Sequence, residues 1–344
     1  MGRWHQDPGD PGTDVSVVVC YHGGDLLKRC LQSLATSQGV TFETLLITSV
    51  DQWWNEPGIG LSVYWEQGGP AHKRNEGVRH AKADTIVFLD DDVEVSPFTL
   101  YHLWQGLKER PQAGMLFSRI YNMERREELD DCGSWLTWTG FLYARAGSLS
   151  DRADLTVPRR CLASKSATCA VTRRSFLDAG GFDAAYYILG EETDLAWRMW
   201  LRGWHVWYEP RAVSWHAFNT SLKPTPTYYT LQRIHRYGAR NYLRCLSTNL
   251  GLLRLVRVVP CQLAIWTLAA LGFVLRGQPA RGWAILQGLL DVVRELPAIA
   301  RKRRQVQGGR TITDRDLMRV VQRSPSPSYY VRRLYQYLLQ GLHG

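Results

Sequence analysis

The sequence has no paired cysteine motif and no apolar run among its first residues. The seven cysteines are scattered and odd in number and form no CxxC pair, which argues against a disulfide frame or a zinc site and favours reduced thiols. The first residues contain Pro and Gly but no apolar run, so we expect a disordered tail over residues 1–13 and no secretory signal. The composition, 45% hydrophobic and 22% charged, is otherwise that of a globular protein.

Acidic residues are nearly absent from the last third of the chain. Of the 32 Asp and Glu, four lie in residues 221–344, whereas 20 of the 42 Lys and Arg lie there. The net charge is therefore −6 over residues 1–220 and +16 over the remainder. A basic segment of this kind suits an anionic surface, and the aliphatic runs between its charges favour lipid over nucleic acid. We expect an anionic membrane surface as a partner and no nucleic acid.

The first hundred residues alternate short apolar runs with segments of helical spacing. The predicted strands are Val15–Cys20, Phe42–Thr48, Leu61–Trp65 and Thr85–Leu89, and the predicted helices are Asp25–Ser37 and His72–Lys82. This alternation is typical of a doubly wound α/β layer. In such sheets, ligands bind beyond the carboxyl ends of the strands.

Three carboxylates stand at one of these strand ends. Asp90, Asp91 and Asp92 directly follow the predicted strand Thr85–Leu89. At ~4 Å and an effective dielectric near 20, each like-charge pair costs roughly 4 kcal/mol, which a bound cation would offset. Carboxylate oxygens are ligands for hard divalent ions such as Mg²⁺ and Mn²⁺. The cluster therefore favours a metal site over a solvated acidic loop.

A second acidic patch marks the predicted start of another helix. Glu191, Glu192 and Asp194 follow Gly190, and the helix dipole stabilises ionised carboxylates at that end. An ionised Glu that reaches an acceptor hydroxyl is a competent general base. Asp194 can instead pair with Arg198 one turn later, so Glu191 and Glu192 are the functional candidates.

A long apolar run lies in the basic region. Val258–Leu275 holds 18 residues without a charge, at the lower edge of what a transmembrane helix needs. The 13 Lys and Arg that follow it would break the positive-inside tendency after a single crossing. Interfacial or re-entrant helices with a basic collar fit better. The alternative is a helical subdomain packed on the rest of the chain.

Four segments together resemble the family 2 glycosyltransferases of the GT-A fold, especially the rhamnosyltransferase-like and galactofuranosyltransferase-like members. The segments occur in the family's order and spacing and read VSVVVCYHGGDLLKRCLQSL, GGPAHKRNEGVRHAKADTIVFLDDDV, ATCAVTRRSFLDAGGFD and LGEETDLAWRMWLRGWHVWYEPRAVSWH. The resemblance implies a doubly wound mixed sheet flanked by helices over residues 14–225. Its nucleotide-binding half would be 14–100 and its acceptor half 101–225. Residues 226–344 would form a helical, basic, membrane-associating region.

The resemblance also implies roles for individual residues. Asp90 and Asp92 would hold Mn²⁺ or Mg²⁺ on the donor diphosphate, and His216, which ends an apolar strand, would complete the metal site. Taken alone, His216 would more often be a structural residue. Glu192 falls on the catalytic base, with Glu191 as the alternative if the register differs by one. The nucleotide-sugar contacts would fall on Cys20, Tyr21, Asp51, Arg74, Asn75, Asp90 and Asp91.

The sequence departs from the family pattern at three places. Val19-Cys20-Tyr21-His22 stands where the family has Pro-Thr-Tyr-Asn, and the family's base position holds Glu in place of Asp. Thr48-Ser49 replaces the usual Asp after the second strand and leaves Asp51 as the nearest carboxylate. Two other functions therefore stay open. One is a sugar-phosphate nucleotidyltransferase, whose glycine-rich phosphate loop is lacking here, and the other is a non-catalytic, membrane-recruited module that binds sugar nucleotides.

The function that the resemblance implies is an inverting hexosyl or deoxyhexosyl transfer. The donor would be a UDP- or dTDP-sugar, and the acceptor a hydroxyl of a glycan or lipid-linked glycan in cell-surface polysaccharide synthesis. The base would take the acceptor proton while the oxygen attacks the anomeric carbon from the face opposite the leaving group. We expect the protein at the cytoplasmic face of the cell membrane, attached as a peripheral or monotopic protein.

Overall fold

The structure, a computed structural model, describes residues 12–21, 23–50, 61–144, 155–217 and 231–340. Residues 1–11 of the predicted tail lie outside these ranges, as does the predicted boundary at residue 225. The division of the chain into the three predicted regions therefore stays a prediction.

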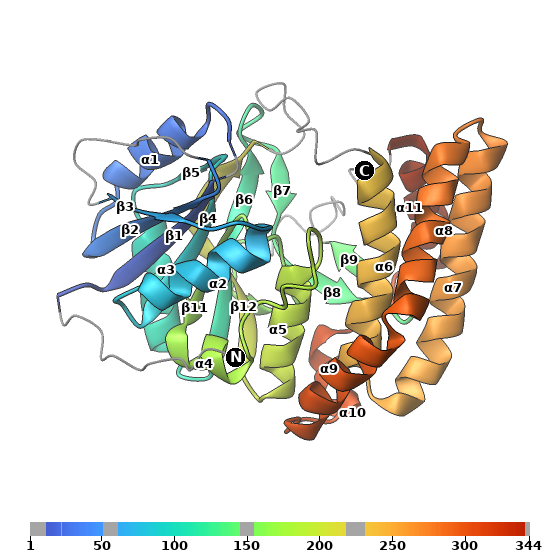
Figure 1. Cartoon of the computed structure of the whole chain (residues 1–344). Helices are drawn as coiled ribbons and strands as arrows, with labels where there is room; N and C mark the ends of the chain where they lie inside the picture. The colour runs from blue at the N-terminus through green and yellow to red at the C-terminus, as the bar shows by residue number, and fades with distance from the viewer. Residues whose placement is uncertain (1–11, 22, 51–60, 145–154, 218–230, 341–344) are drawn as a thin grey trace.

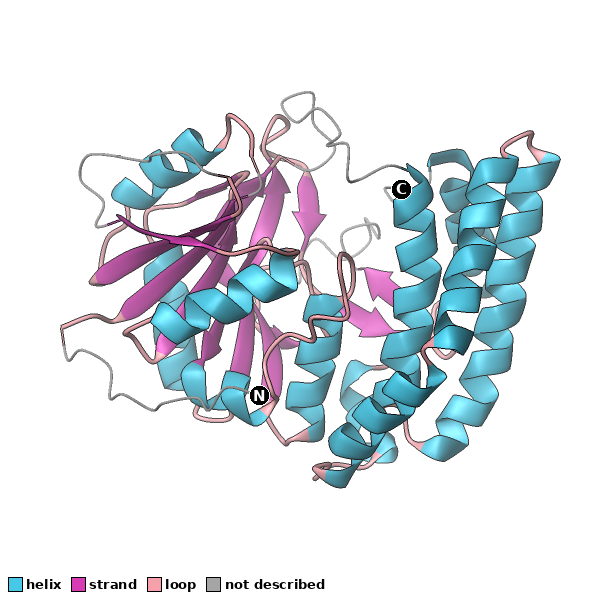
Figure 2. Ribbon diagram, viewed as in Figure 1, coloured by secondary structure: helices cyan, strands magenta, loops and turns pink. Residues whose placement is uncertain are grey.

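A mixed β-sheet forms the centre of the N-terminal part of the chain (Figures 1 and 2). Its strands are β1 (Val15–Tyr21), β2 (Phe42–Thr48), β3 (Leu61–Trp65), β4 (Thr85–Asp90), β5 (Val93–Val95), β6 (Ala113–Asn122), β7 (Leu129–Asp131), β10 (Arg159–Arg160), β11 (Thr168–Thr172) and β12 (His205–His216). Within the described residues the order is β10-β12-β6-β11-β4-β1-β2-β3, with β5 on β12 and β7 on β6. Strands β1 to β4 pair in parallel, whereas β11 runs antiparallel to both of its neighbours.

Helices cover both faces of this sheet. They are α1 (Leu27–Ala35), α2 (Pro70–His80), α3 (Thr99–Glu109), α4 (Arg173–Asp178) and α5 (Glu191–Leu201). Val17 and Val19 of β1 belong to a core cluster with α1 and α3, while Val18 and Cys20 belong to a second cluster with α2, α4 and α5. Because both faces are buried, β1 reads as a continuous apolar run, which is why its sequence predicts a strand of this kind. The predicted α/β fold is confirmed.

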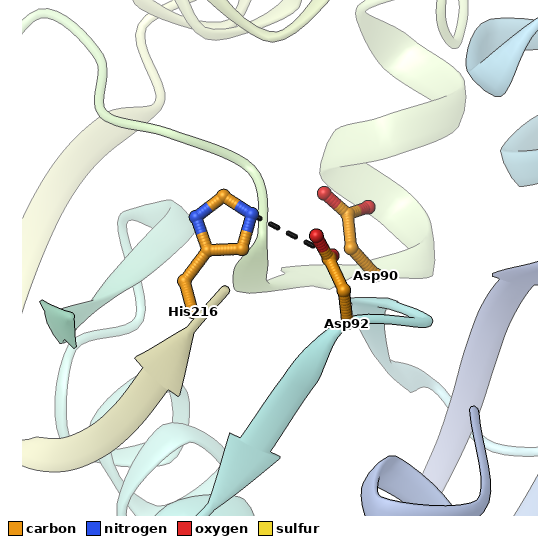
Figure 3. A group of neighbouring side chains, drawn as sticks. All are labelled: Asp90, Asp92 and His216. Atoms are coloured by element: carbon orange, nitrogen blue, oxygen red, sulfur yellow. Dashed lines mark ion pairs between the residues drawn. The ribbon is translucent and has the colours of Figure 1, made fainter. Parts of the chain in front are cut away.

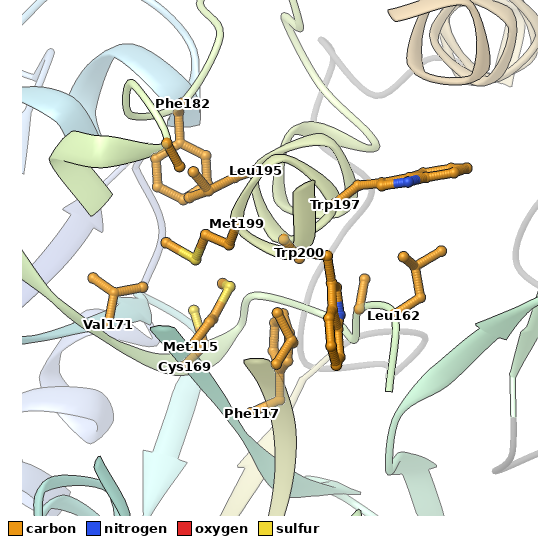
Figure 4. Packing of buried hydrophobic residues seen from close by; sticks show 14 of the residues in the cluster. Met115, Phe117, Leu162, Cys169, Val171, Phe182, Leu195, Trp197, Met199 and Trp200 are labelled. Carbon is orange, nitrogen blue, oxygen red and sulfur yellow. The ribbon is translucent and has the colours of Figure 1, made fainter. Parts of the chain in front are cut away.

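Helix α5 lies against the sheet through bulky apolar side chains (Figure 4). Leu195, Met199 and Trp200 are buried in one cluster with Met115 and Phe117 of β6 and with residues of β11. The indole of Trp200 also donates a hydrogen bond to the carbonyl of Cys161 at 2.9 Å. These contacts hold the helix whose first turn carries the two candidate base residues.

The described C-terminal residues are helical, as predicted, and stand beside the sheet layer (Figure 1). The helices are α6 (Leu231–Asn249), α7 (Leu252–Leu275), α8 (Pro279–Arg294), α9 (Leu296–Gly308), α10 (Asp314–Val321) and α11 (Pro327–Gln340). A small sheet of β8 (Ser134–Leu136) and β9 (Leu142–Ala144) lies between them and the main sheet. Leu246, Val258 and Leu317 belong to the same core cluster as Trp200. The helical region therefore packs directly on the α/β layer.

Candidate active site

The metal-ligand candidates lie together at the carboxyl ends of two strands (Figure 3). Asp90 ends β4, Asp92 lies in the turn before β5, and His216 ends β12. One ligand atom from each residue lies within 4.8 Å of the others, and His216 Nε2 is 3.5 Å from Asp92 Oδ1. Two carboxylates and an imidazole are a donor set that suits Mn²⁺ or Mg²⁺ with further oxygen ligands from water or phosphate.

Short strand β5 brings His216 to the aspartates. His216 is aligned with Val93 in the antiparallel β5–β12 pair, and the Ala217 amide donates to the Asp92 carbonyl at 3.0 Å. The aspartate turn and the end of β12 are thus tied by backbone hydrogen bonds. This pairing explains how a histidine 124 positions after Asp92 can reach the same site.

Asp130 orients the imidazole from its other side. Asp130 Oδ2 lies 3.3 Å from His216 Nδ1, and Lys165 Nζ donates to Asp130 Oδ1 at 2.5 Å. Burial lowers the pKa of His216, but Asp92 and Asp130 outweigh it and raise the value to about 9. Hydrogen bonding of a histidine's second nitrogen to a carboxylate fixes the ring orientation in many metal sites. Asp130 was not predicted from the sequence, although the pair Asp130-Asp131 offered a signal.

The candidate base residues occupy the first turn of α5. Leu189, with φ of 67°, and Gly190, with φ of 88°, turn the chain into the helix. Glu191 is buried at 6% exposure, whereas Glu192 is half-buried. Burial and the neighbouring Glu191 raise the pKa of Glu192 well above its usual value.

One arginine joins the two acidic groups. Arg74 of α2 donates from Nη2 to Asp90 Oδ1 at 2.8 Å and from Nη1 to Glu191 Oε1 at 2.9 Å. Its side chain is 3% exposed. A Cβ on Gly77, one turn later, would lie 2.2 Å from Val18, so glycine lets α2 rest directly on β1. This close approach brings Arg74 to the strand ends.

Two predicted nucleotide contacts lie at the end of β1. Cys20 is buried, and burial raises the pKa of its thiol to about 12, so this side chain is a neutral core residue. The Tyr21 carbonyl accepts a hydrogen bond from the buried Lys73 at 2.5 Å. Lys73 was not among the predicted contacts, and it also donates to Ser49 Oγ at 3.1 Å.

The remaining predicted contacts differ in their placement. Asp91 is half-buried in the turn between β4 and β5. The amide of Asn75 donates to the Phe182 carbonyl and accepts from the Phe182 amide, both at 2.9 Å. Asn75 therefore ties α2 to the segment before α5. Asp51 lies outside the described residues.

The part of the chain that holds this site matches a known protein family. The profile of the family described as "Glycosyltransferase like family 2" matches residues 11–230, a range that holds all of these site residues. The chain belongs to glycosyltransferase family 2. The family resemblance expected from the four sequence segments is confirmed.

Three curated relatives of this family 2 chain are informative. An uncharacterized Mycobacterium tuberculosis protein is 26% identical over 254 residues, covering 66% of this chain and 77% of the relative. The pre-mycofactocin glycosyltransferase of M. tuberculosis is 28% identical, covering 45% and 31%. The poly-β-1,6-N-acetyl-D-glucosamine synthase of Staphylococcus aureus is 25% identical, covering 44% and 34%. The chain spans about a third of the length of the two glycosyltransferases with assigned names.

Solved structures share the fold. S. aureus TarS in complex with UDP-GlcNAc superposes with a TM-score of 0.54 at 13% identity, covering 86% of this chain and 88% of that one. A mannosyltransferase from Pyrobaculum calidifontis in complex with GDP-mannose and Mn²⁺ gives 0.52 at 15% identity, covering 98% and 89%. At these identities the likeness concerns the fold, and the predicted GT-A architecture is confirmed.

Proposed function

We propose that the chain transfers a sugar, with inversion, from a UDP- or dTDP-sugar to a hydroxyl of a glycan or lipid-linked glycan. The sugar would be a hexose or deoxyhexose, and the product part of a cell-surface polysaccharide. Asp90, Asp92 and His216 would hold Mn²⁺ or Mg²⁺, which when bound offsets charge on the departing diphosphate. The named structural neighbours are complexes with GDP-mannose and with UDP-GlcNAc, which supports a sugar nucleotide as the donor.

Glu192 and Arg74 have different roles in the proposed transfer. Glu192 accepts the proton of the acceptor hydroxyl while that oxygen forms a bond to the anomeric carbon. The bond from this carbon to the diphosphate oxygen breaks on the opposite face, so the nucleoside diphosphate leaves with the bonding electrons. Arg74 holds Glu191 and Asp90 in fixed positions, because a guanidinium can donate to two carboxylates at once.

The observation that carries the proposal is the shared arginine between the two acidic groups. Arg74 is a buried cation that pairs both with a metal-ligand candidate, Asp90, and with Glu191, the neighbour of the proposed base. Here the 2.8 Å and 2.9 Å contacts of Arg74 set Glu191 beside Asp90. Glu192 follows Glu191 in the first turn of α5, so the same contacts hold the helix turn that bears the proposed base next to the metal-ligand candidates.

A panel of sugar nucleotides tests the proposal. Each of several UDP-, dTDP- and GDP-sugars is incubated with the full chain and Mn²⁺, and release of nucleoside diphosphate is measured. With water as the acceptor, turnover that needs a divalent ion is expected for a UDP- or dTDP-sugar, and NMR should show the freed sugar forming first as the inverted anomer, before mutarotation. Release of pyrophosphate from a nucleoside triphosphate plus a sugar phosphate would instead indicate a nucleotidyltransferase. No turnover with any donor would indicate a binding module.

We also propose attachment to the cytoplasmic face of the membrane through α7 and its neighbours. Among the described helices, α7 is the one that is long and apolar enough to cross a membrane. Its most apolar stretch of 18 residues has a mean hydropathy of 2.0, and a third of that stretch is buried. Its exposed large apolar residues are Leu252, Leu253, Val256, Leu263, Leu268, Leu271, Val274 and Leu275. Exposed Arg257 lies within the first half of α7 and exposed Arg276 directly follows the helix, and both suit anionic headgroups.

The packing of α7 favours an interfacial position over a crossing. Gln262, near the middle of the helix, is fully buried and donates to the Thr139 carbonyl at 2.7 Å. A Cβ on Gly140 would lie 2.6 Å from Val258. The middle of α7 is thus held against the β8–β9 connection, which would have to enter the bilayer if the helix crossed it. Backbone of this kind is not stable in contact with lipid.

A further inference from the structure

One face of α6 contacts residues 183–189, the segment that precedes the two candidate base residues. Tyr237, Arg240, Asn241 and Arg244 follow the i, i+3, i+4, i+7 spacing of a single helix face. The Tyr237 ring stacks on Tyr187 with centroids 5.7 Å apart. Arg240 donates to the Ala185 carbonyl at 3.0 Å, and Arg244 pairs with Asp183 at 3.2 Å.

Asn241 makes the contacts nearest to the base. Its Nδ2 donates to the carbonyls of Ile188 at 2.6 Å and Leu189 at 2.7 Å, and the residue is 2% exposed. Its Oδ1 accepts from Arg240 Nη1 at 2.7 Å. An arginine can only donate, so this contact fixes which end of the amide faces the two carbonyls.

The two carbonyls belong to a strained turn. Leu189 is the one non-glycine residue with positive φ in the part of the chain that the structure describes. Such a conformation is strained for a residue with a side chain and persists only where the surroundings impose it. Asn241 binds this turn three and two residues before the helix that begins with Glu191 and Glu192.

The same helix face is anchored in the basic C-terminal region. Arg240 donates to both carboxylate oxygens of Glu295, at 2.7 Å and 2.8 Å, and Arg244 pairs with Glu295 at 3.1 Å. Arg236 binds Asp291 through two hydrogen bonds. The acidic partners lie at the C-terminal end of α8 and just beyond it. The turn before α5 is therefore held from the helices outside the family match.

We propose that Asn241 is a positioning residue that sets the catalytic carboxylate of α5 by holding the Ile188–Leu189 turn. The inference rests on the proposed function, since it takes Glu192, or Glu191 one position earlier, as the base. It assigns to the C-terminal region a part in the reaction besides membrane attachment. Because Asn241 is buried, the role assigned to it is exerted through the turn and not through contact with substrate.

Asn249 provides a matched control on the same helix. It is also fully buried, and its Nδ2 donates to α5, at Asp194 Oδ1, at 2.9 Å. We expect Asn241→Ala to lower kcat about 10- to 100-fold, the scale on which small displacements of a reacting group act. The KM for the donor identified in the panel should change less than about twofold. Asn249→Ala should lose a similar amount of thermal stability while its kcat stays within about threefold of the parent.

A double variant separates positioning from general damage. If Asn241 acts through the base, adding Asn241→Ala to Glu192→Gln should lower kcat no further. If Glu191→Gln proves to be the variant with the large loss of kcat, the same test is made in that background.

Asn241→Asp is isosteric, keeps the oxygen that accepts from Arg240 and removes the amide N–H donors to the two carbonyls. It should reproduce the loss and serves if Asn241→Ala does not fold. Equal kcat values for Asn241→Ala and Asn249→Ala, or full multiplication of the effects in the double variant, would overturn the inference. Undiminished kcat in both single Glu variants would instead overturn the proposed base.

Discussion

Arg74 and Glu191 form a buried ion pair, with Nη1 and Oε1 2.9 Å apart and both side chains less than 10% exposed. The two residues lie 117 positions apart in the chain. Since the same guanidinium also binds Asp90 at 2.8 Å, any change at this position reaches both the metal ligands and the first turn of α5.

Replacing Arg74 by lysine tests this bridge. A lysine ammonium is a compact charge that cannot present the two-pronged geometry of a guanidinium, so Glu191 or Asp90 loses its partner. Breaking a buried pair costs about 3–5 kcal/mol, and we expect a clear drop in Tm together with a loss of at least about tenfold in kcat. Arg79→Lys is the control, because Arg79 is on the same helix with a 56% exposed side chain. Equal effects of the two changes would contradict the bridge.

The strands and helices of the α/β layer were predictable because their patterns are local. The strand predicted at Val15–Cys20 is β1, Val15–Tyr21, and the strand predicted at Phe42–Thr48 is β2 with the same bounds. A run of β-branched residues buried on both faces carries that information within six or seven positions. The placement of Asp90 and Asp92 after a strand was predictable for the same reason.

Local sequence patterns did not reveal the tertiary contacts of the site, and the grouping of His216 with Asp90 and Asp92 was implied only by the family resemblance. Arg74 was expected to contact the nucleotide, and its contacts with Asp90 and Glu191 depend on the packing of α2 against β1 at Gly77. The β5–β12 pair that brings His216 to Asp92 contains three aligned positions, too few for a signal. The region after residue 226 is predicted as basic and helical, with a Tyr- and Arg-rich helix over Tyr228–Arg244, but the contacts of this helix with the segment before α5 depend on tertiary packing.

Metal binding should be measurable without turnover. We expect Mn²⁺ to raise the Tm of the parent chain, because a ligand that binds only the folded state stabilises it. Asp92→Asn should abolish both this shift and the transfer activity, since it removes a charged ligand from the Asp90, Asp92 and His216 group. Asp84→Asn, at a carboxylate that is 90% exposed, should leave both intact. A parent-like Mn²⁺ shift in Asp92→Asn would argue against this metal site.

The two glutamates at the start of α5 should differ in effect. Glu192→Gln removes the proposed base and should lower kcat by roughly 10²-fold or more with little change in donor affinity, the usual scale for loss of a general base. Glu191→Gln keeps the size of a side chain that pairs with Arg74 and should weaken the pair and lower Tm. If Glu191→Gln carries the larger loss in kcat and Glu192→Gln is mild, Glu191 is the base.

Stability should respond to pH through Glu192. Burial and the adjacent Glu191 raise its pKa well above the usual range, so the folded protein binds this proton more tightly than the unfolded chain. Ionisation therefore lowers stability once the pH exceeds the unfolded value of about 4.3. Glu192→Gln should raise Tm at about pH 7.5 by a few degrees and change it little near pH ~4. A lower Tm for this variant at neutral pH would contradict the assigned environment.

Membrane attachment should depend on the exposed apolar residues of α7. The full chain is expected to float with vesicles that contain anionic lipid, because buried apolar side chains and about 1 kcal/mol for each engaged basic residue add together. Salt should release it only in part, since screening weakens the charge attraction and not apolar burial. Leu263→Glu combined with Leu271→Glu should abolish flotation, as both residues lie exposed on α7 at 41% and 51%.

Phe98→Glu is the matched control for this experiment, because Phe98 is an apolar residue of similar exposure, 47%, at the start of α3. It should leave flotation unchanged. Alkaline carbonate then separates the two modes of attachment. Release of the chain is expected, because Gln262 and Val258 keep the middle of α7 against the β8–β9 connection. Retention in the membrane pellet would mean that α7 leaves this packing and crosses the bilayer. A full chain that stays monomeric in solution without lipid or detergent, and does not float, would mean that the helices form only a packed subdomain.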